Sequence, residues 1–225
     1  MVRENLNRQI LHIQEEILLL GSMVEQAILS SVDSLKRRDV QSAREIYESD
    51  HAINDKRFAI ENAILILFAT QQPMAHDLRL LAGMLEINTE LERMGDYAKG
   101  IAKVVIKLEN SSIDIPIKEF SRMADLAVSM LHRALSAFIS ENISQAMQIP
   151  MDDKDVDLLY ENIYHLLVEK MIKNPEMIDQ TNLLIWVAHN LERTADRVTN
   201  ICERTVFIGT GELMEIEFQD EEDVE

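Results

Sequence analysis

The chain has 225 residues, of which 40 are acidic and 22 are lysine or arginine, so its formal net charge is −18. Nucleic acids and anionic membranes are bound through basic patches, and this charge argues against both as direct partners. Hydrophobic residues make up 47% of the chain, but only 6 residues are glycine and 4 are proline, a composition that favours helices over turn-rich sheets.

The sequence also bears on cellular location. A single cysteine rules out a disulfide framework and suits a reducing cytoplasm. The N-terminal residues lack an apolar signal core, and the longest uninterrupted apolar run, 63–69, is too short to span a bilayer. We therefore expect a cytoplasmic protein without direct membrane insertion.

The first half of the chain predicts three long helices. Over 5–38, apolar residues recur at steps of three and four, the period of an amphipathic helix. Asp39 is a candidate N-cap for a second helix that runs to about residue 70. Pro73 is expected in the first turn of a third helix, which ends at about residue 109. The apolar stripe of the first helix consists of Leu6, Ile10, Ile13, Ile17, Leu20, Val24, Ile28, Val32 and Leu35.

After a linker at 110–116, the second half repeats this order. A fourth helix is predicted over 117–141, Asn142 caps a fifth, and a sixth opens at 174–175. Pro150 should kink the fifth helix or delay its regular start. Asn142 follows Asp39 by 103 positions, and Asp153 follows Asp50 by the same interval. The sequence therefore predicts an all-α, up-down fold of six long helices.

This repetition divides the chain into two tandem three-helix bundles. The first predicted unit covers 1–112 and the second covers 113–211. The remaining residues, 212–225, form a strongly acidic tail.

A six-residue frame appears twice, once in the third and once in the sixth predicted helix. Residues 91–96 read Leu-Glu-Arg-Met-Gly-Asp, and residues 191–196 read Leu-Glu-Arg-Thr-Ala-Asp. In a helix, carboxylates four residues apart are neighbours and repel each other by a few tenths of a kcal/mol. A hard cation between them would remove that repulsion. Glu92, Asp96, Glu192 and Asp196 are therefore candidate metal ligands, although an inherited helix-packing face would also explain the frame.

Further oxygen ligands occur on the second and fifth helices at the same spacing of four. Asp50 and Asn54 could complete a site in the first unit, and Asp153 and Asp157 could do so in the second. His189 lies seven residues before Asp196 and is a further candidate, although a lone histidine is more often a surface residue.

An enzyme is the weaker alternative. A di-metal carboxylate bundle requires two Glu-x-x-His pairs with inward-facing acids, and only Glu48 and His51 fit that pattern. No nucleophile is paired with a base, and no glycine-rich phosphate loop is present.

Three stretches together resemble the PhoU family of phosphate-uptake regulators. They are Gln-Gln-Pro-Met-Ala-His-Asp-Leu-Arg at 71–79, Leu-Glu-Arg-Met-Gly-Asp-Tyr-Ala at 91–98, and Asn-Leu-Glu-Arg at 190–193. The resemblance implies two tandem three-helix bundles that bind Fe, Zn, Mg or Mn through the Glu/Asp-x-x-x-Asp motif. It also implies a homodimeric negative regulator that links the ATPase of a phosphate-specific ABC transporter to a phosphate-sensing membrane histidine kinase.

Carried over by position, the family's motif acids match Glu92, Asp96, Glu192 and Asp196. Many members have histidine after a motif Asp, where this chain has tyrosine at 97 and arginine at 197. Lysines at 99 and 103 flank the first motif, whereas threonine and glutamate occupy 199 and 203. We therefore expect the two halves to differ in metal affinity, with the stronger site in the second.

Overall fold

The computed structural model describes residues 2–216, and within that range the chain forms helices and no strands. The six long helices are α1 (Val2–Arg37), α2 (Val40–Gln71), α3 (His76–Lys107), α4 (Ile117–Ile139), α6 (Asp153–Lys173) and α7 (Ile178–Thr210). The short helix α5 (Ile143–Gln148) and two 3-10 turns, η1 (Ile149–Asp152) and η2 (Pro175–Met177), complete the described elements. The predicted all-α class is confirmed. Of the expected acidic tail, residues 217–225 lie outside the described residues.

The predictions for Pro73 and Pro150 had different outcomes. Pro150 lies in the turn η1, so regular helix resumes only at Asp153, and the predicted delay is confirmed. The placement of Pro73 in the first turn of the third helix is wrong, because that helix begins at His76. Gln72 and Ala75 have positive φ angles of 46° and 49°, so the chain changes direction twice before it enters the helix.

The corners that follow the first and fourth helices have the same local geometry. Arg38 and Glu141 both adopt positive φ, at 54° and 48°. At the next position, an Asp39 carboxylate oxygen accepts the Ser42 N–H at 3.0 Å, and the Asn142 side-chain oxygen accepts the N–H three residues later at the same distance. Both residues are therefore N-caps, as the sequence predicted.

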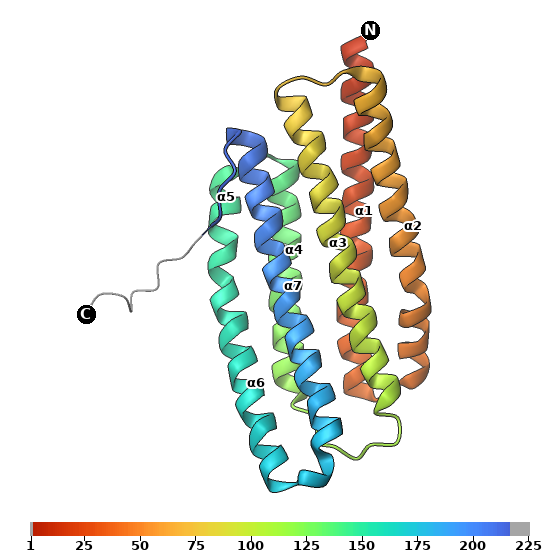
Figure 1. Ribbon diagram of the computed structural model, residues 1–225, viewed down its shortest axis with the longest axis vertical. Helices are drawn as coiled ribbons and strands as arrows, with labels where there is room; N and C mark the ends of the chain where they lie inside the picture. The colour runs from red at the N-terminus through yellow and green to blue at the C-terminus, as the bar shows by residue number, and fades with distance from the viewer. Residues whose placement is uncertain (1, 217–225) are drawn as a thin grey trace, which may run out of the picture.

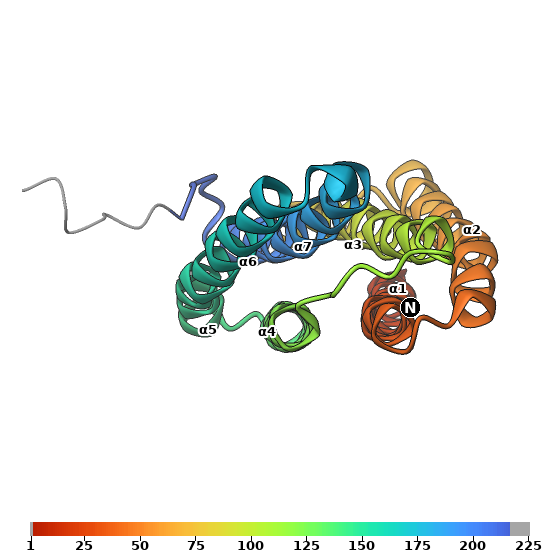
Figure 2. The same ribbon diagram turned by 90° about the horizontal axis from the view of Figure 1, so that it is seen from below.

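The helices form two neighbouring groups, α1–α3 and α4–α7, which meet along the antiparallel pair α3 and α7 (Figure 1). Seen end-on, α6, α7, α3 and α2 form one curved layer, and α4 and α1 lie behind it (Figure 2). All nine residues of the α1 stripe are buried, with at most 7% exposure, as are Leu184, Val187, Leu191, Val198 and Ile201 on α7. Each such side chain contributes about 2 kcal/mol through burial of its apolar surface.

Helix α1 is the one described helix whose length and composition would also allow a membrane span. Its apolar stripe instead faces the core of the bundle. The single cysteine, Cys202, is a buried core side chain, and burial raises the pKa of its thiol to about 12. Its thiol is therefore protonated at neutral pH, as expected of a small apolar core residue.

Two glycines let α7 approach α3 closely. A Cβ at Gly83 would lie 2.7 Å from the end of Ile208, and a Cβ at Gly100 would lie 2.4 Å from the ring of Trp186. Any larger residue at either position would have to displace these α7 side chains. The two helices can therefore pack side by side along most of their length.

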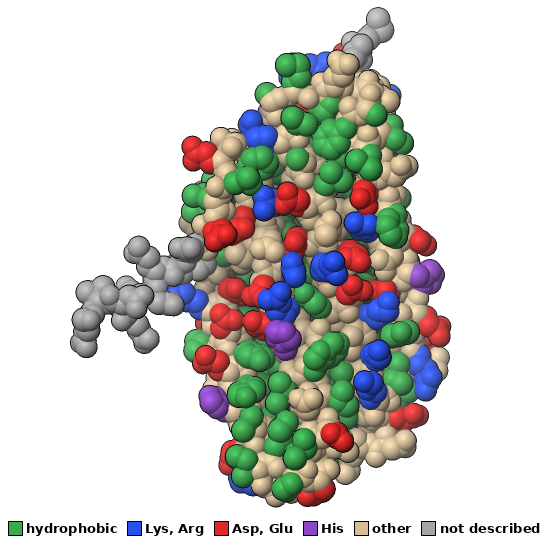
Figure 3. Space-filling view, in the orientation of Figure 1, with side chains coloured by type: hydrophobic (Ala, Val, Ile, Leu, Met, Phe, Trp, Pro, Cys, Tyr) green, Lys and Arg blue, Asp and Glu red, His purple; other side chains and the backbone are tan. Residues whose placement is uncertain are grey.

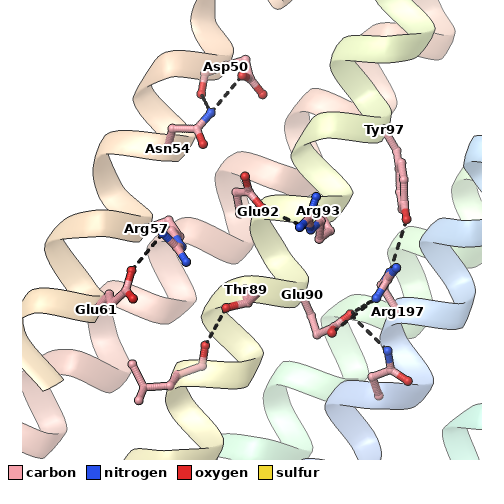
Figure 4. A network of polar contacts seen from close by, with 12 residues as sticks. Asp50, Asn54, Arg57, Glu61, Thr89, Glu90, Glu92, Arg93, Tyr97 and Arg197 are labelled. Atoms are coloured by element: carbon pink, nitrogen blue, oxygen red, sulfur yellow. Dashed lines mark hydrogen bonds and ion pairs between the residues drawn. The ribbon is translucent and has the colours of Figure 1, made fainter. Parts of the chain in front are cut away.

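A polar network crosses this contact at the middle of the molecule (Figure 4). Arg197 of α7 donates to the Tyr97 hydroxyl at 3.3 Å and to a Glu90 carboxylate oxygen at 3.2 Å. The side chain of Asn200 donates to the same glutamate at 3.2 Å. Tyr97 and Arg197 each follow the last residue of one of the two repeated frames, so the network lies where the two halves face each other.

Loss of this network is expected to loosen the contact between α3 and α7. In a double-mutant cycle with Arg197→Ala and Glu90→Gln, the coupling energy should be about 1–2 kcal/mol, because both side chains are largely buried and charged. Urea unfolding of the four proteins measures it. The exposed pair Arg37 and Asp33 is the control and should couple by at most about 0.5 kcal/mol. Equal coupling in the two cycles would contradict a structural role for Arg197.

Candidate metal sites on the outer helical layer

Acidic and basic side chains are mixed across the middle of the layer formed by α6, α7, α3 and α2 (Figure 3). All candidate ligands from the sequence lie on these four helices. Glu92, Asp96, Glu192 and Asp196 are partly exposed at the border of the core. The candidates form one cluster between α6 and α7 and another between α2 and α3.

In the second half, α6 supplies Asp153 and Asp157, and α7 supplies Glu192 and Asp196. Burial, followed by the nearby charges of Asp157, Asp196 and Glu192, raises the pKa of Asp153 to about 7. Burial, followed by Asp196 and Asp157, raises the pKa of Glu192 to about 7. Burial likewise raises the pKa of Asp196. The four carboxylates therefore lie close enough to repel one another in a setting that hydrates them poorly.

Two oxygens of this cluster are buried without a hydrogen-bond partner, Asp153 Oδ1 and Glu192 Oε2. His189 Nδ1 lies 3.2 Å from that Glu192 oxygen, but the two groups are not aligned as a hydrogen bond. His189 is half exposed, and its ring contacts Tyr160 of α6, with the ring centroids 6.3 Å apart. Arg193 pairs with Asp196 at 3.2 Å from the solvent side. The ion pairs of His189 and Arg193 therefore lie at the rim of this cluster, and the charge of Arg197, which is bonded to Glu90, also acts on Asp196.

Glu203 contacts a different segment. Its Oε1 accepts the backbone N–H of Ile216 at 3.0 Å, so it holds the segment that follows α7 against the helix. In the sequence, Glu203 lies seven residues after Asp196 of the second motif. The structure gives that carboxylate a partner of its own.

The first half has a different arrangement. Asp50 of α2 is 5% exposed, and its Oδ2 accepts the Lys99 ammonium at 2.7 Å and the Asn54 amide at 3.0 Å. On α3, Glu92 lies beside Arg93, with 3.8 Å between the carboxylate oxygen and the guanidinium nitrogen (Figure 4). Burial, followed by the charge of Asp96, raises the pKa of Glu92. A lysine therefore binds one oxygen of the carboxylate that the sequence had offered to a metal, while the other oxygen, Asp50 Oδ1, is buried without a hydrogen-bond partner.

The residues present only partly fit a metal. Carboxylate oxygens are the donors that hard cations prefer, and the second cluster has two buried oxygens without hydrogen-bond partners where the first has one, Asp50 Oδ1. Among the described residues 2–216, however, no three His, Cys, Asp or Glu side chains converge closely enough to hold an ion. Binding between α6 and α7 would therefore require rotation of carboxylate side chains toward one another. Asp157 is exposed, whereas Asp153 and Glu192 are partly buried.

The Glu-x-x-His pair that the alternative, a di-metal enzyme, would use does not face the bundle core. Glu48 and His51, the one Glu-x-x-His pair, are both exposed on α2. The ring nitrogen of His51 contacts the backbone carbonyl of Glu48 and not its carboxylate. A di-metal centre of that class requires such pairs to project into the bundle core.

Comparison with known proteins identifies the family. The model of the PhoU domain matches twice, at residues 17–105 and 120–205. A phosphate-specific transport system accessory protein PhoU homolog from Clostridium acetobutylicum is 33% identical over 217 residues, which cover 96% of this chain and 99% of the relative. The phosphate-specific transport system accessory protein PhoU of Escherichia coli is 29% identical over 92% of this chain and 86% of its own length.

Solved structures agree with this assignment. The crystal structure of the phosphate transport system regulatory protein PhoU from Streptococcus pneumoniae matches with a TM-score of 0.85 and 32% identity, over 93% of this chain and 99% of that one. The crystal structure of PhoU from Pseudomonas aeruginosa matches with the same TM-score and 28% identity, over 92% of this chain and 99% of that one. Sequence, fold and the doubled domain match agree, and the chain belongs to the PhoU family.

Proposed function

We propose that this chain is a cytoplasmic, non-enzymatic negative regulator of phosphate uptake and phosphate signalling. In this role it acts as an adaptor between the ATPase of a phosphate-specific ABC transporter and a phosphate-sensing membrane histidine kinase, and it acts as a homodimer. The observation that carries the proposal is family membership over nearly the whole chain, together with relatives that are accessory proteins of phosphate-specific transport systems. The acidic surface suits docking to a basic protein surface.

The proposal includes a divalent or iron cation, Fe, Zn, Mg or Mn, held between α6 and α7. Asp153, Asp157, Glu192 and Asp196 would hold it, with His189 at the rim. A bound cation would supply positive charge among carboxylates that otherwise repel one another. The middle of the outer layer would then change both its charge and the positions of its side chains, and a partner that contacts this layer could distinguish the two states.

Binding to the transporter ATPase tests the proposal directly. The immobilised protein is expected to retain the purified ATPase of a phosphate-specific ABC transporter, with greater retention in Mn²⁺ than in a chelator. Asp196→Ala should abolish the difference between the two conditions, because it removes a carboxylate from the cluster. Asp179→Ala is the matched control, since this exposed acid lies on the same helix outside the cluster. No retention of the ATPase in either condition would contradict the adaptor role.

A further inference from the structure

In the first half, the ammonium of Lys99 lies between a carboxylate and an aromatic ring. This ammonium lies 2.7 Å from Asp50 Oδ2 and 5.4 Å from the centre of the Tyr47 ring, whose face attracts positive charge. Asp50 is the only residue among the proposed ligands that is almost fully buried, at 5% exposure. A buried carboxylate requires a positive partner, and here the protein supplies one from its own chain.

Asp50 corresponds to Asp153 in the second half, but the three residues that surround Asp50 differ from their counterparts there. With the interval of 103 positions that relates α2 to the α5–α6 segment, Tyr47 corresponds to Pro150, and Asn54 corresponds to Asp157. With the interval of 100 positions that relates α3 to α7, Lys99 corresponds to Thr199. The second half therefore lacks the ring, has a carboxylate where the first half has an amide, and has a neutral hydroxyl where the first half has an ammonium.

The charges of the two clusters differ accordingly. The first contains three carboxylates, on Asp50, Glu92 and Asp96, and the Lys99 ammonium is bonded to the most buried of them. Arg93 lies beside Glu92, and Arg57 nearby pairs with Glu61. The second cluster contains four carboxylates. His189 and Arg193 lie at its rim, 51% and 42% exposed, and the charge of Arg197, which is bonded to Glu90, also acts on Asp196. The ion pairs of His189 and Arg193 therefore lie at the exposed side of the second cluster, whereas that of Lys99 reaches the most buried carboxylate of the first.

We propose that Lys99 is the permanent cation of the first half, so that the first half takes no metal and the second half alone binds it. The proposal rests on metal binding by the second half, as proposed above. It assigns the two repeats different tasks. The first repeat has a fixed charge distribution, and only the second changes with the metal supply. Metal would therefore bind, and change the surface charge, on only one side of the contact between α3 and α7.

Equilibrium dialysis of metal-free protein against Mn²⁺, followed by metal analysis of the protein, tests this assignment. As single substitutions, Asp196→Ala should remove the bound Mn²⁺, whereas Asp96→Ala should leave the amount of bound Mn²⁺ unchanged. Lys99→Thr, which installs the residue of the second half, should increase bound Mn²⁺ about twofold, because it frees the Asp50 carboxylate for a second ion. Asp96→Ala added to Lys99→Thr should remove the increase. Lys103→Thr, an exposed lysine one turn further along α3, is the matched control and should have no effect.

The possible results separate the two proposals. Loss of Mn²⁺ in Asp96→Ala alone, or no increase in a natively helical Lys99→Thr, overturns the role of Lys99. If Lys99→Thr loses helicity, Lys99→Met retains the aliphatic stem without the charge and must give the same increase. A wild type that binds no Mn²⁺ overturns the metal site of the second half. In that case, the role of Lys99 stands if Lys99→Thr binds Mn²⁺ and falls if it does not.

Discussion

Mn²⁺ added to the metal-free protein near neutral pH is expected to raise the free energy of unfolding by about 3–4 kcal/mol when its concentration is several hundred times the dissociation constant. The physical reason is linkage, because the folded chain places four carboxylates together between α6 and α7, and the unfolded chain does not. Two of their oxygens are buried without a hydrogen-bond partner, so the metal-free folded state has an electrostatic cost that binding removes. Urea unfolding followed by circular dichroism, with and without Mn²⁺, measures the gain.

Two variants show whether the gain comes from this cluster. Asp196→Ala should abolish most of it, while Asp179→Ala, an exposed acid on the same helix, should retain it. The metal-free Asp196→Ala protein should be at least as stable as the metal-free wild type, because one of the repelling charges is gone. A full Mn²⁺ effect in Asp196→Ala would place the stabilising ion elsewhere on this acidic chain.

Without metal, the free energy of unfolding is expected to decrease as pH rises from about 5 to about 8, by about 2 kcal/mol in total. Asp153 and Glu192 have folded-state pKa values of about 7, above their usual values of 3.8 and 4.5. At pH values between the usual pKa and the folded-state pKa of each group, the folded state retains a proton that the unfolded state has released. The favourable contribution is therefore complete below about pH 4 and is lost as pH rises through about 7. The predicted size is discounted for partial solvent exposure of the groups.

The Asp153→Asn variant checks the origin of this pH dependence. It removes one titrating group and one repelling charge, so the decrease should become shallower and stability at high pH should increase. Saturating Mn²⁺ should reverse the direction, because metal binds the deprotonated carboxylates. Chemical denaturation at a series of pH values measures all three curves. A wild-type curve that is flat or rises over this range would contradict the clustering of these acids.

Much of the fold could be predicted from the sequence, because its signals are local. The spacing of apolar residues on α1 determines which side faces the core, and every residue of that stripe is buried. Asp39 and Asn142 begin helices through a hydrogen bond to a backbone group three residues away. The position of Pro73 was wrong for two reasons. A proline limits the backbone conformations of itself and the preceding residue, but it does not determine how many residues later the next helix begins. The positive φ angles of Gln72 and Ala75 are also not indicated by the residue types at those positions.

The site could be predicted only in part, since its contacts join helices that are distant in sequence. The spacing of Glu92 and Asp96 predicted that the two carboxylates are neighbours on one helix, and the charge of Asp96 does act on Glu92. The contact of Lys99 with Asp50 depends on how α2 is rotated against α3, which periodicity within one helix does not determine. The contribution of Tyr47 was missed, although comparison with Pro150, 103 positions later, could have indicated that this position differs between the repeats.

The most direct measurement of the central claim is anomalous X-ray diffraction from crystals of the wild-type protein grown with Mn²⁺. We expect a manganese peak between α6 and α7, within coordination distance of carboxylate oxygens from Asp153, Asp157, Glu192 or Asp196. We expect no peak beside Asp50, where the ammonium of Lys99 should remain. Peaks of equal height in both halves would contradict the proposed difference between the repeats. The absence of a peak between α6 and α7 at saturating Mn²⁺ would contradict the metal site itself.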